Sequence, residues 1–384
     1  MRDVDHLLIG GGIASASAAQ ELVKQGATSI LLVGRELDPP YERPPATKSY
    51  LRGESSKQDA LIDIPEPAEV LTRISVMNLD TEARIATLSN KEEVRYGSAL
   101  IATGAMVRRP QIEGGQLDGI HFIRTLPNAD SLREDIQQAK QVVIVGGSFI
   151  GVEVAASLVE LGKQVTIVML EDHPFANTLG ERVGRWVRSL LEGHGIEVLG
   201  GAPLAELKGT ERVESVELED GRSIAAQAVV MGIGVTPDVM LARKAGLELG
   251  EAGGVKADAK LQTSAERLFV AGDIAEYESV IHGGASRRIE HFEVAAAQGR
   301  TAARNMMGAG ETFAAVPYFW SDIADWATLE CVGAPLQWDE ERVDGDESAG
   351  AFSVRYIKDG TLVGALSIGG HGDLDAAVAE LTSG

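Results

Sequence analysis

The arrangement of apolar residues near the start of the chain predicts a strand–helix–strand unit. Residues 7–9 and 30–33 are continuous apolar runs, and the alanine-rich segment 13–25 lies between them. Such runs are typical of parallel strands that are buried on both faces, and a helix between two of them completes a βαβ unit. The same pattern recurs as strand, helix and strand at 142–145, 149–161 and 165–169. The chain is therefore predicted to have an α/β fold.

Shorter patterns predict the remaining elements. They are strands at 74–79, 84–88 and 99–102, short strands within 196–231, a buried strand at 267–273 and a helix at about 291–306. From residue 316 aromatic residues cluster, and strand-like segments at 351–357 and 361–368 precede a last helix at about 373–382. We interpret this tail as a small α+β domain and its acidic stretch Asp339–Glu347 as a solvated loop.

Charge narrows the functional classes. The 384 residues include 35 Lys and Arg against 57 Asp and Glu, which gives a formal net charge of −22. Nucleic acids and anionic membranes both attract basic surfaces, so neither is expected as a partner. The chain opens without a signal-peptide pattern, and its long apolar stretch 142–161 carries Glu153 and Glu160. We therefore expect a cytoplasmic protein without a membrane span.

The cysteine content excludes one class of redox chemistry. Cys331 is the only cysteine, so neither a structural disulfide nor a redox dithiol can form within the chain. We interpret Cys331 as a small buried residue. The sequence shows no metal-ligand pattern, and no metal is expected.

Two glycine-rich turns, each between a strand and a helix, carry the candidate chemistry. The first spans Gly10–Ser15 and the second Gly146–Gly151. Glycine lets the backbone approach a pyrophosphate closely, and the free N–H groups that open the helix stabilise its negative charge. One such turn is a weak signal, but two in one chain indicate two dinucleotides and electron transfer between them.

Further tracts, in matching order along the chain, resemble the FAD-dependent pyridine nucleotide-disulfide oxidoreductases, and most closely their ferredoxin reductase and apoptosis-inducing-factor branch. Besides the two turns they are Tyr41–Lys48, Ala102–Gly104, Ala271–Asp273 and Arg288–Phe292. The resemblance implies two Rossmann-like dinucleotide-binding domains plus a small C-terminal α+β domain. The expected limits are 1–110 and 240–315 for the FAD-binding domain, 111–239 for the NAD(P)H-binding domain and 316–384 for the C-terminal domain.

By this resemblance, the first turn and four later tracts bind FAD. Lys48 would place a cation near the flavin, and Asp273 would bind its ribityl hydroxyls unless it only caps a helix. Glu36 would accept from the adenosine ribose or remain a solvated turn residue. His291 and Trp320 would contact the flavin or belong only to the core. The expected FAD residues are Gly10, Gly12, Ile13, Ala14, Ser15, Arg35, Glu36, Arg43, Lys48, Val76, Ala102, Thr103, Gly104, Gly272, Asp273, Glu290, His291, Phe292 and Trp320.

The second turn would hold the nicotinamide nucleotide. Glu153 would form the catalytic pair with Lys48. Alternatively, its negative charge would only stabilise the N-terminus of its own helix. Glu171 and Asp172 follow the second βαβ unit with no cation beside them in the sequence, which favours the free 2′-hydroxyl of NADH over the 2′-phosphate of NADPH. The expected residues are Gly146, Gly147, Ser148, Phe149, Ile150, Gly151, Glu153, Glu171, Gly232, Ile233 and Gly234.

The resemblance implies an NAD(P)H-dependent flavoprotein oxidoreductase. Hydride would pass from NADH, or from NADPH, to FAD, and electrons would then pass to an external acceptor such as a ferredoxin. An acidic ferredoxin would dock on Arg287, Arg288, Arg300 and Arg304, unless these arginines pair with the chain's own carboxylates. The alternative is a redox-gated interaction protein that oxidises NADH slowly. A monomer and a homodimer both remain open.

Overall fold

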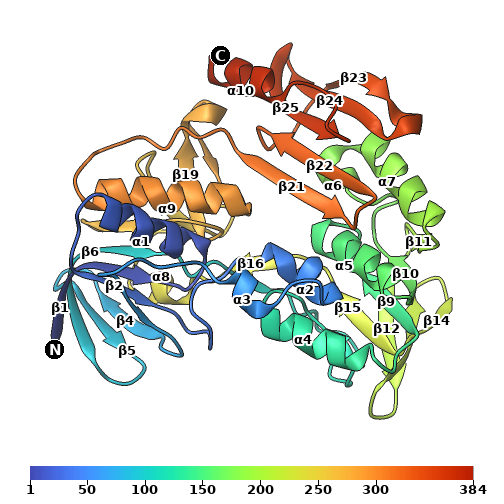
Figure 1. Ribbon diagram of the computed structural model, residues 1–384, viewed down its shortest axis with the longest axis horizontal. Helices are drawn as coiled ribbons and strands as arrows, with labels where there is room; N and C mark the ends of the chain where they lie inside the picture. Colours follow the sequence, from blue (N-terminus) through green and yellow to red (C-terminus); the bar gives the residue numbers. More distant parts are fainter. Residues whose placement is uncertain (384) are drawn as a thin grey trace.

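The computed structural model describes residues 1–383, and its first unit is built on a seven-stranded sheet (Figure 1). The strands are β1 (Arg2–Ile9), β2 (Ile30–Val33), β3 (Glu69–Leu71), β4 (Val76–Asp80), β5 (Ile85–Leu88), β6 (Glu93–Ile101) and β18 (Leu268–Val270). Five of them run parallel in the order β3-β2-β1-β6-β18, and β5 and β4 add an antiparallel edge. The apolar runs expected to be strands are therefore buried in the centre of this sheet.

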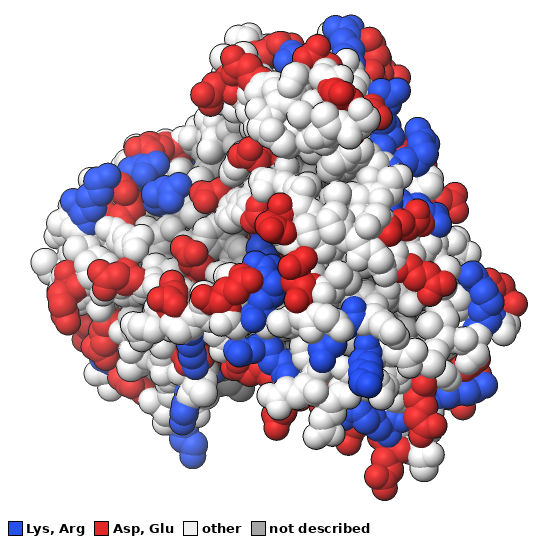
Figure 2. Space-filling model, turned by 45° about the vertical axis from the view of Figure 1, so that its right-hand side comes forward, with Lys and Arg blue, Asp and Glu red and all other residues white. Residues whose placement is uncertain are grey.

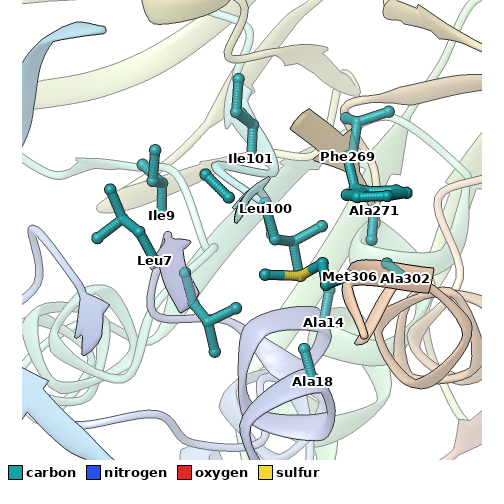
Figure 3. Close-up of a cluster of buried hydrophobic side chains, with 14 of the residues drawn as sticks. Leu7, Ile9, Ala14, Ala18, Leu100, Ile101, Phe269, Ala271, Ala302 and Met306 are labelled. Carbon is teal, nitrogen blue, oxygen red and sulfur yellow. The ribbon is translucent and has the colours of Figure 1, made fainter. Parts of the chain in front are cut away.

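Helices α1 (Ile13–Lys24) and α9 (Phe292–Met306) pack side by side on this sheet (Figure 1). Small side chains form their contact, and Ala14 and Ala18 of α1 face Ala302 of α9 beside the buried strands (Figure 3). The two helices approach closely at Gly299, because a Cβ atom there would lie 2.1 Å from the carbonyl oxygen of Ala14. The alanine-rich composition of both helices thus sets the distance between their axes.

The second unit contains the other βαβ pattern. Its five-stranded sheet is entirely parallel, in the order β11-β10-β9-β15-β8. Its strands are β8 (Ile120–His121), β9 (Gln141–Val145), β10 (Gln164–Val168), β11 (Glu197–Leu199) and β15 (Ala228–Met231). Its helices are α4 (Leu126–Asp135), α5 (Phe149–Glu160), α6 (Ala176–Leu179) and α7 (Glu181–Gly193). An antiparallel sheet of β12 (Leu204–Gly209), β13 (Val213–Leu218) and β14 (Ser223–Ala225) accompanies it.

A short ribbon joins the two units where the chain leaves the first sheet and returns to it. β7 (Ala105–Val107) pairs antiparallel with β16 (Val235–Pro237), although the two are far apart in sequence. The remaining helices and strands before the C-terminal unit are α2 (Ser49–Arg52), α3 (Lys57–Ala60), α8 (Met240–Lys244), β17 (Val255–Ala257), β19 (Ala275–Ser279) and β20 (Ala285–Arg287).

The C-terminal unit is an antiparallel five-stranded sheet with one helix, as the change in composition at residue 316 predicted. Its order is β21-β22-β25-β24-β23, and its elements are β21 (Tyr318–Ile323), β22 (Ala327–Val332), β23 (Glu340–Asp346), β24 (Ala351–Lys358), β25 (Thr361–Ile368) and α10 (Leu374–Ser383). Phe319 and Ile323 of β21 join one hydrophobic cluster with α5, so the sheet is fixed against the second unit. Cys331 is fully buried in this cluster, as expected.

The interpretation of Asp339–Glu347 as a solvated loop was wrong, because most of it forms β23. β23 lies at the edge of the sheet, where it pairs only with β24, and most of its side chains are exposed. The side chains of an exposed edge strand stay in water, so charged residues there do not lower stability. The composition of such a strand therefore resembles that of a loop. In residues 1–383 no helix is both long and apolar enough to cross a membrane.

The α1–α9 contact allows a direct test of stability. We expect Gly299→Ala to lower the free energy of unfolding by about 1–3 kcal/mol, because the new methyl group would overlap the Ala14 carbonyl and force the helices apart. Urea unfolding measures the change. Gly193→Ala is the matched control, because nothing lies within 4 Å of the added Cβ at the end of α7. Equal stability of both variants would contradict the proposed packing constraint.

Candidate functional site

All three units contribute to one cavity of about 1070 Å³, which is at the upper end of the size range for cofactor sites. Eighteen of the nineteen expected FAD residues line it, all except Ser15. Seven of the eleven expected nicotinamide-nucleotide residues also line it, namely Ser148, Phe149, Ile150, Glu153, Gly232, Ile233 and Gly234. Residues expected from separate parts of the sequence therefore meet at a single site.

The first glycine turn forms an open cradle at this cavity. Gly10 has a φ of +124°, and a Cβ there would lie 2.1 Å from the carbonyl oxygen of Ala102, so only glycine fits. A Cβ at Gly12 would have nothing within 4 Å, which leaves room for another group above the turn. Gly12 precedes α1 and supplies no side-chain cap for its first N–H groups. These donors fit a pyrophosphate, as FAD would provide.

Ion pairs line the cavity beyond this turn. The Glu36 carboxylate accepts from Arg43 and from the hydroxyl of Tyr41. Burial raises the pKa of Glu36, but Arg43, together with the Tyr41 hydroxyl and Arg35, outweighs it and holds the pKa below its usual value. Arg35 contacts Asp238 at 2.6 Å. Glu36 is thus a paired, ionised acceptor at the cavity wall and not a solvated turn residue.

Asp273 pairs with a residue that the sequence did not single out. Arg124, just before α4, donates to the Asp273 carboxylate, and both line the cavity. The two residues lie 149 positions apart, so no local pattern could have joined them. Asp273 is therefore a charged group at the cavity and caps no described helix.

Lys48 and Glu153 lie together where the three units meet. Lys48 Nζ is 3.5 Å from Glu153 Oε1, and the hydroxyls of Thr47 and Ser321 donate to the Glu153 carboxylate at 2.6 and 2.7 Å. Burial raises the pKa of Glu153 above its usual value, although Lys48 and both hydroxyls favour the charged form. Lys48 Nζ also donates to Asp322 at 2.9 Å. The sequence placed Lys48 and Glu153 at the site but missed their other partners.

Aromatic rings surround this pair. His291 stacks on Phe319 with centroids 4.4 Å apart, and Phe149 meets both rings edge-on. Trp320 contacts Phe292 and lies under the Lys48 ammonium at 5.5 Å. All five of these rings line the cavity, so His291 and Trp320 are not confined to the core.

Five expected residues do not line the cavity. Ser15 is fully buried in α1, and its hydroxyl has no hydrogen-bond partner. Gly146 and Gly151 pack against backbone, since Cβ atoms there would lie 2.3 Å from the Gly232 oxygen and 2.1 Å from the Gly146 oxygen. The two others are Gly147 and Glu171. The second turn is therefore packed more tightly than the first, although its following helix α5 also lacks a side-chain cap.

The loop after β10 covers the second turn. A Cβ at Gly147 would lie 2.4 Å from Met169 Sδ, and the Gly147 carbonyl accepts from the backbone of Phe175. Glu171 accepts from Asn177 at 2.8 Å outside the cavity. Arg188 of α7 contacts the Asp172 carbonyl, a neighbouring cation that the sequence did not reveal.

Two of the four arginines expected to dock an acidic acceptor pair with carboxylates of the chain. Arg288 pairs with Glu290, and Arg304 pairs with Glu21 and Glu311. Figure 2 shows acidic and basic side chains interspersed on the face it presents, without a broad basic area. Arg288 and Arg304 therefore pair with the chain's own carboxylates, which is the alternative that the sequence analysis left open.

Two Rossmann-like units that share one cavity define the class of two-dinucleotide oxidoreductases. Residues 4–299 match the family described as pyridine nucleotide-disulphide oxidoreductase, and residues 318–382 match the reductase C-terminal family. This chain belongs to the pyridine nucleotide-disulphide oxidoreductase family. Membership implies FAD and NAD(P)H as cofactors, and the predicted family, fold class and flavoprotein oxidoreductase activity are confirmed.

Named relatives lie in the branch that the sequence resembles. The probable ferredoxin reductase CtmF of Castellaniella defragrans is 33% identical over 364 residues, which cover 93% of this chain and 88% of that protein. Apoptosis-inducing factor 3 of Homo sapiens is 28% identical over 94% of this chain and 60% of its own length. The ferredoxin reductase for the CYP199A2 system of Rhodopseudomonas palustris is 30% identical, with a TM-score of 0.90, and covers 95% of this chain and 91% of that chain.

His291 predicts a pH dependence of stability. Burial lowers its pKa from 6.5 to about 4, so between these values the unfolded chain binds a proton that the folded chain does not. Stability therefore falls as pH falls through this window, by at most about 1.4 kcal/mol per pH unit. In urea unfolding at neutral pH and at about pH 5, His291→Phe should lose less stability than the parent. An equal loss would show that His291 does not titrate in this way.

Proposed function

We propose that this protein is an NADH-dependent reductase that holds FAD in the cavity and passes electrons to a ferredoxin-type iron–sulfur protein. The observation that carries the proposal is that residues 10–14 of the first glycine turn, residues 148–150 of the second turn, Lys48 and Glu153 all line one cavity. In this proposal residues 1–110 and 240–315 bind FAD, residues 111–239 bind the nicotinamide nucleotide, and residues 316–384 cover the site. When bound, FAD would convert a two-electron donor reaction into single-electron transfers.

The chain's own residues would bind, orient and balance charge. The N–H groups that open α1 would hold the pyrophosphate, with Gly10 keeping the turn close to Ala102. Asp273 would accept from ribityl hydroxyls while Arg124 keeps its carboxylate in place. Lys48 would place its ammonium where negative charge develops on reduction. The aromatic wall of Phe319 and His291 would exclude water from the same region.

A ferredoxin-type acceptor is supported by the relatives. The proteins from Castellaniella defragrans and Rhodopseudomonas palustris are both described as ferredoxin reductases, and each matches most of this chain at 30% identity or more. Cys331 is buried and has no partner cysteine, so electrons would leave without an internal disulfide. The chain is also similar to apoptosis-inducing factor 3. Slow oxidation of NADH with every acceptor would therefore count against the reductase proposal.

A purified sample should be yellow, should release FAD on denaturation, and should oxidise NADH rapidly when given a ferredoxin. Steady-state NADH oxidation with ferredoxins, cytochrome c and ferricyanide tests this, because ferricyanide reports flavin reduction without a docking site. Ferricyanide turnover without any ferredoxin turnover would overturn the acceptor assignment. Slow turnover with every acceptor, together with a change in molecular size on adding NADH, would favour the redox-gated interaction protein.

NADH should be preferred over NADPH, because Glu171 and Asp172 place carboxylates after β10. Glu171→Arg should reduce the NADH-to-NADPH ratio of kcat/KM about tenfold, which corresponds to about 1.4 kcal/mol. Glu219→Arg makes the same charge change on the exposed turn after β13 and serves as the control. A parent enzyme that uses NADPH more efficiently would refute the preference.

A further inference from the structure

The lysine at the site is shared between two carboxylates from different units. Lys48 Nζ lies 2.9 Å from Asp322 Oδ2 but 3.5 Å from Glu153 Oε1. The first distance is that of a charge-assisted hydrogen bond, whereas the second is only within reach of a weaker ionic attraction. The Lys48 ammonium is therefore bonded more closely to Asp322 than to Glu153, although the sequence analysis expected only Glu153 as its partner.

Strand β21 organises this arrangement because successive side chains point to opposite faces of a strand. Trp320 and Asp322 lie on one face, and both contact the Lys48 ammonium. Phe319 and Ser321 lie on the other face, where Ser321 donates to Glu153. One strand of the C-terminal unit thus holds the ammonium with one face and the buried carboxylate with the other.

Asp322 is itself held in place and does not line the cavity. Its Oδ1 atom accepts from the hydroxyl of Thr328, which lies directly opposite on β22. Lys48 lines the cavity and its side chain is only 12% exposed, whereas that of Asp322 is 35% exposed. Asp322 can therefore influence a group in the cavity without touching it, by its charge and by the position of the Lys48 ammonium to which it is bonded.

We propose that Asp322 is a positioning residue that fixes the Lys48 ammonium and offsets its charge at the flavin. The proposal rests on the proposed function, because it requires FAD in the cavity. Reduction by a hydride adds one negative charge to the flavin at neutral pH. An ammonium near that charge favours the reduced form, and a carboxylate bonded to the ammonium weakens the effect. Asp322 thereby keeps the flavin a stronger reductant toward the acceptor.

Removing the charge of Asp322 should therefore raise the reduction potential of bound FAD. We expect Asp322→Asn to shift the flavin equilibrium toward the reduced form about tenfold, which is about 30 mV for a two-electron couple. The asparagine is isosteric and can still accept from Thr328, so the local fold should persist. Asp322→Glu keeps the charge and should return the potential toward that of the parent. Asp322→Ser also removes the charge but has a smaller side chain. It is the second charge-removing variant and carries the test if Asp322→Asn does not fold.

The measurement is a spectroscopic redox titration of the purified, FAD-loaded proteins. Glu330→Gln is the matched control, because it removes a carboxylate from the neighbouring strand that is bonded to the Tyr318 hydroxyl at 2.7 Å and not to Lys48. The control should leave the potential unchanged. A merely structural Asp322 would change the melting temperature or FAD content but not the potential of the loaded protein.

The outcomes separate this inference from the proposed function. A higher potential in Asp322→Asn and Asp322→Ser, with Asp322→Glu and Glu330→Gln near the parent, supports the inference. An unchanged potential in both charge-removing variants overturns it and leaves the proposed function intact. A parent protein that does not bind FAD overturns the proposed function, and the inference with it.

Discussion

The buried carboxylate of Glu153 is the constraint on which the meeting of the three units depends. A carboxylate without partners in the interior is strongly destabilising, and removing one partner of a buried pair typically costs several kcal/mol. The partners of Glu153 come from Thr47 and Lys48, just before α2, and from β21, while Glu153 itself lies on α5. The first unit, the second unit and the C-terminal unit must therefore come together for this one carboxylate to be satisfied.

The two βαβ units obey the same steric rule but present different surfaces. In each unit the first glycine of the turn allows a close approach to a backbone carbonyl, that of Ala102 for Gly10 and that of Gly232 for Gly146. The first turn then opens on the cavity at Gly12. The second is covered at Gly147 by the loop after β10. The same local motif thus yields an open cradle in one unit and a more closed turn in the other.

The cavity wall of this acidic chain is rich in cations, but carboxylates balance them. The cations and their partners are Arg35 with Asp238, Arg43 with Glu36, Arg124 with Asp273, and Lys48 with Asp322 and Glu153. Since these four cations are paired, the backbone N–H groups at the start of α1 are donors that remain suited to phosphate. The same pairing fixes side chains from distant segments and so orders the site before a cofactor binds.

Local patterns along the chain were enough to predict the parallel strands of both βαβ units and their glycine turns, whereas the roles expected of Lys48 and Glu153 rested on the resemblance to a family. Apolar runs, helix spacing and close backbone approach are local properties, so they can be recognised along the chain. The contacts by which Asp322 and Ser321 hold Lys48 and Glu153 emerge only in the folded chain, since they join residues 274 and 168 positions apart. The tertiary structure also decided that Asp339–Glu347 contains an edge strand. Strand pairing and ion pairing across distant segments depend on packing of the whole chain, which no local pattern encodes.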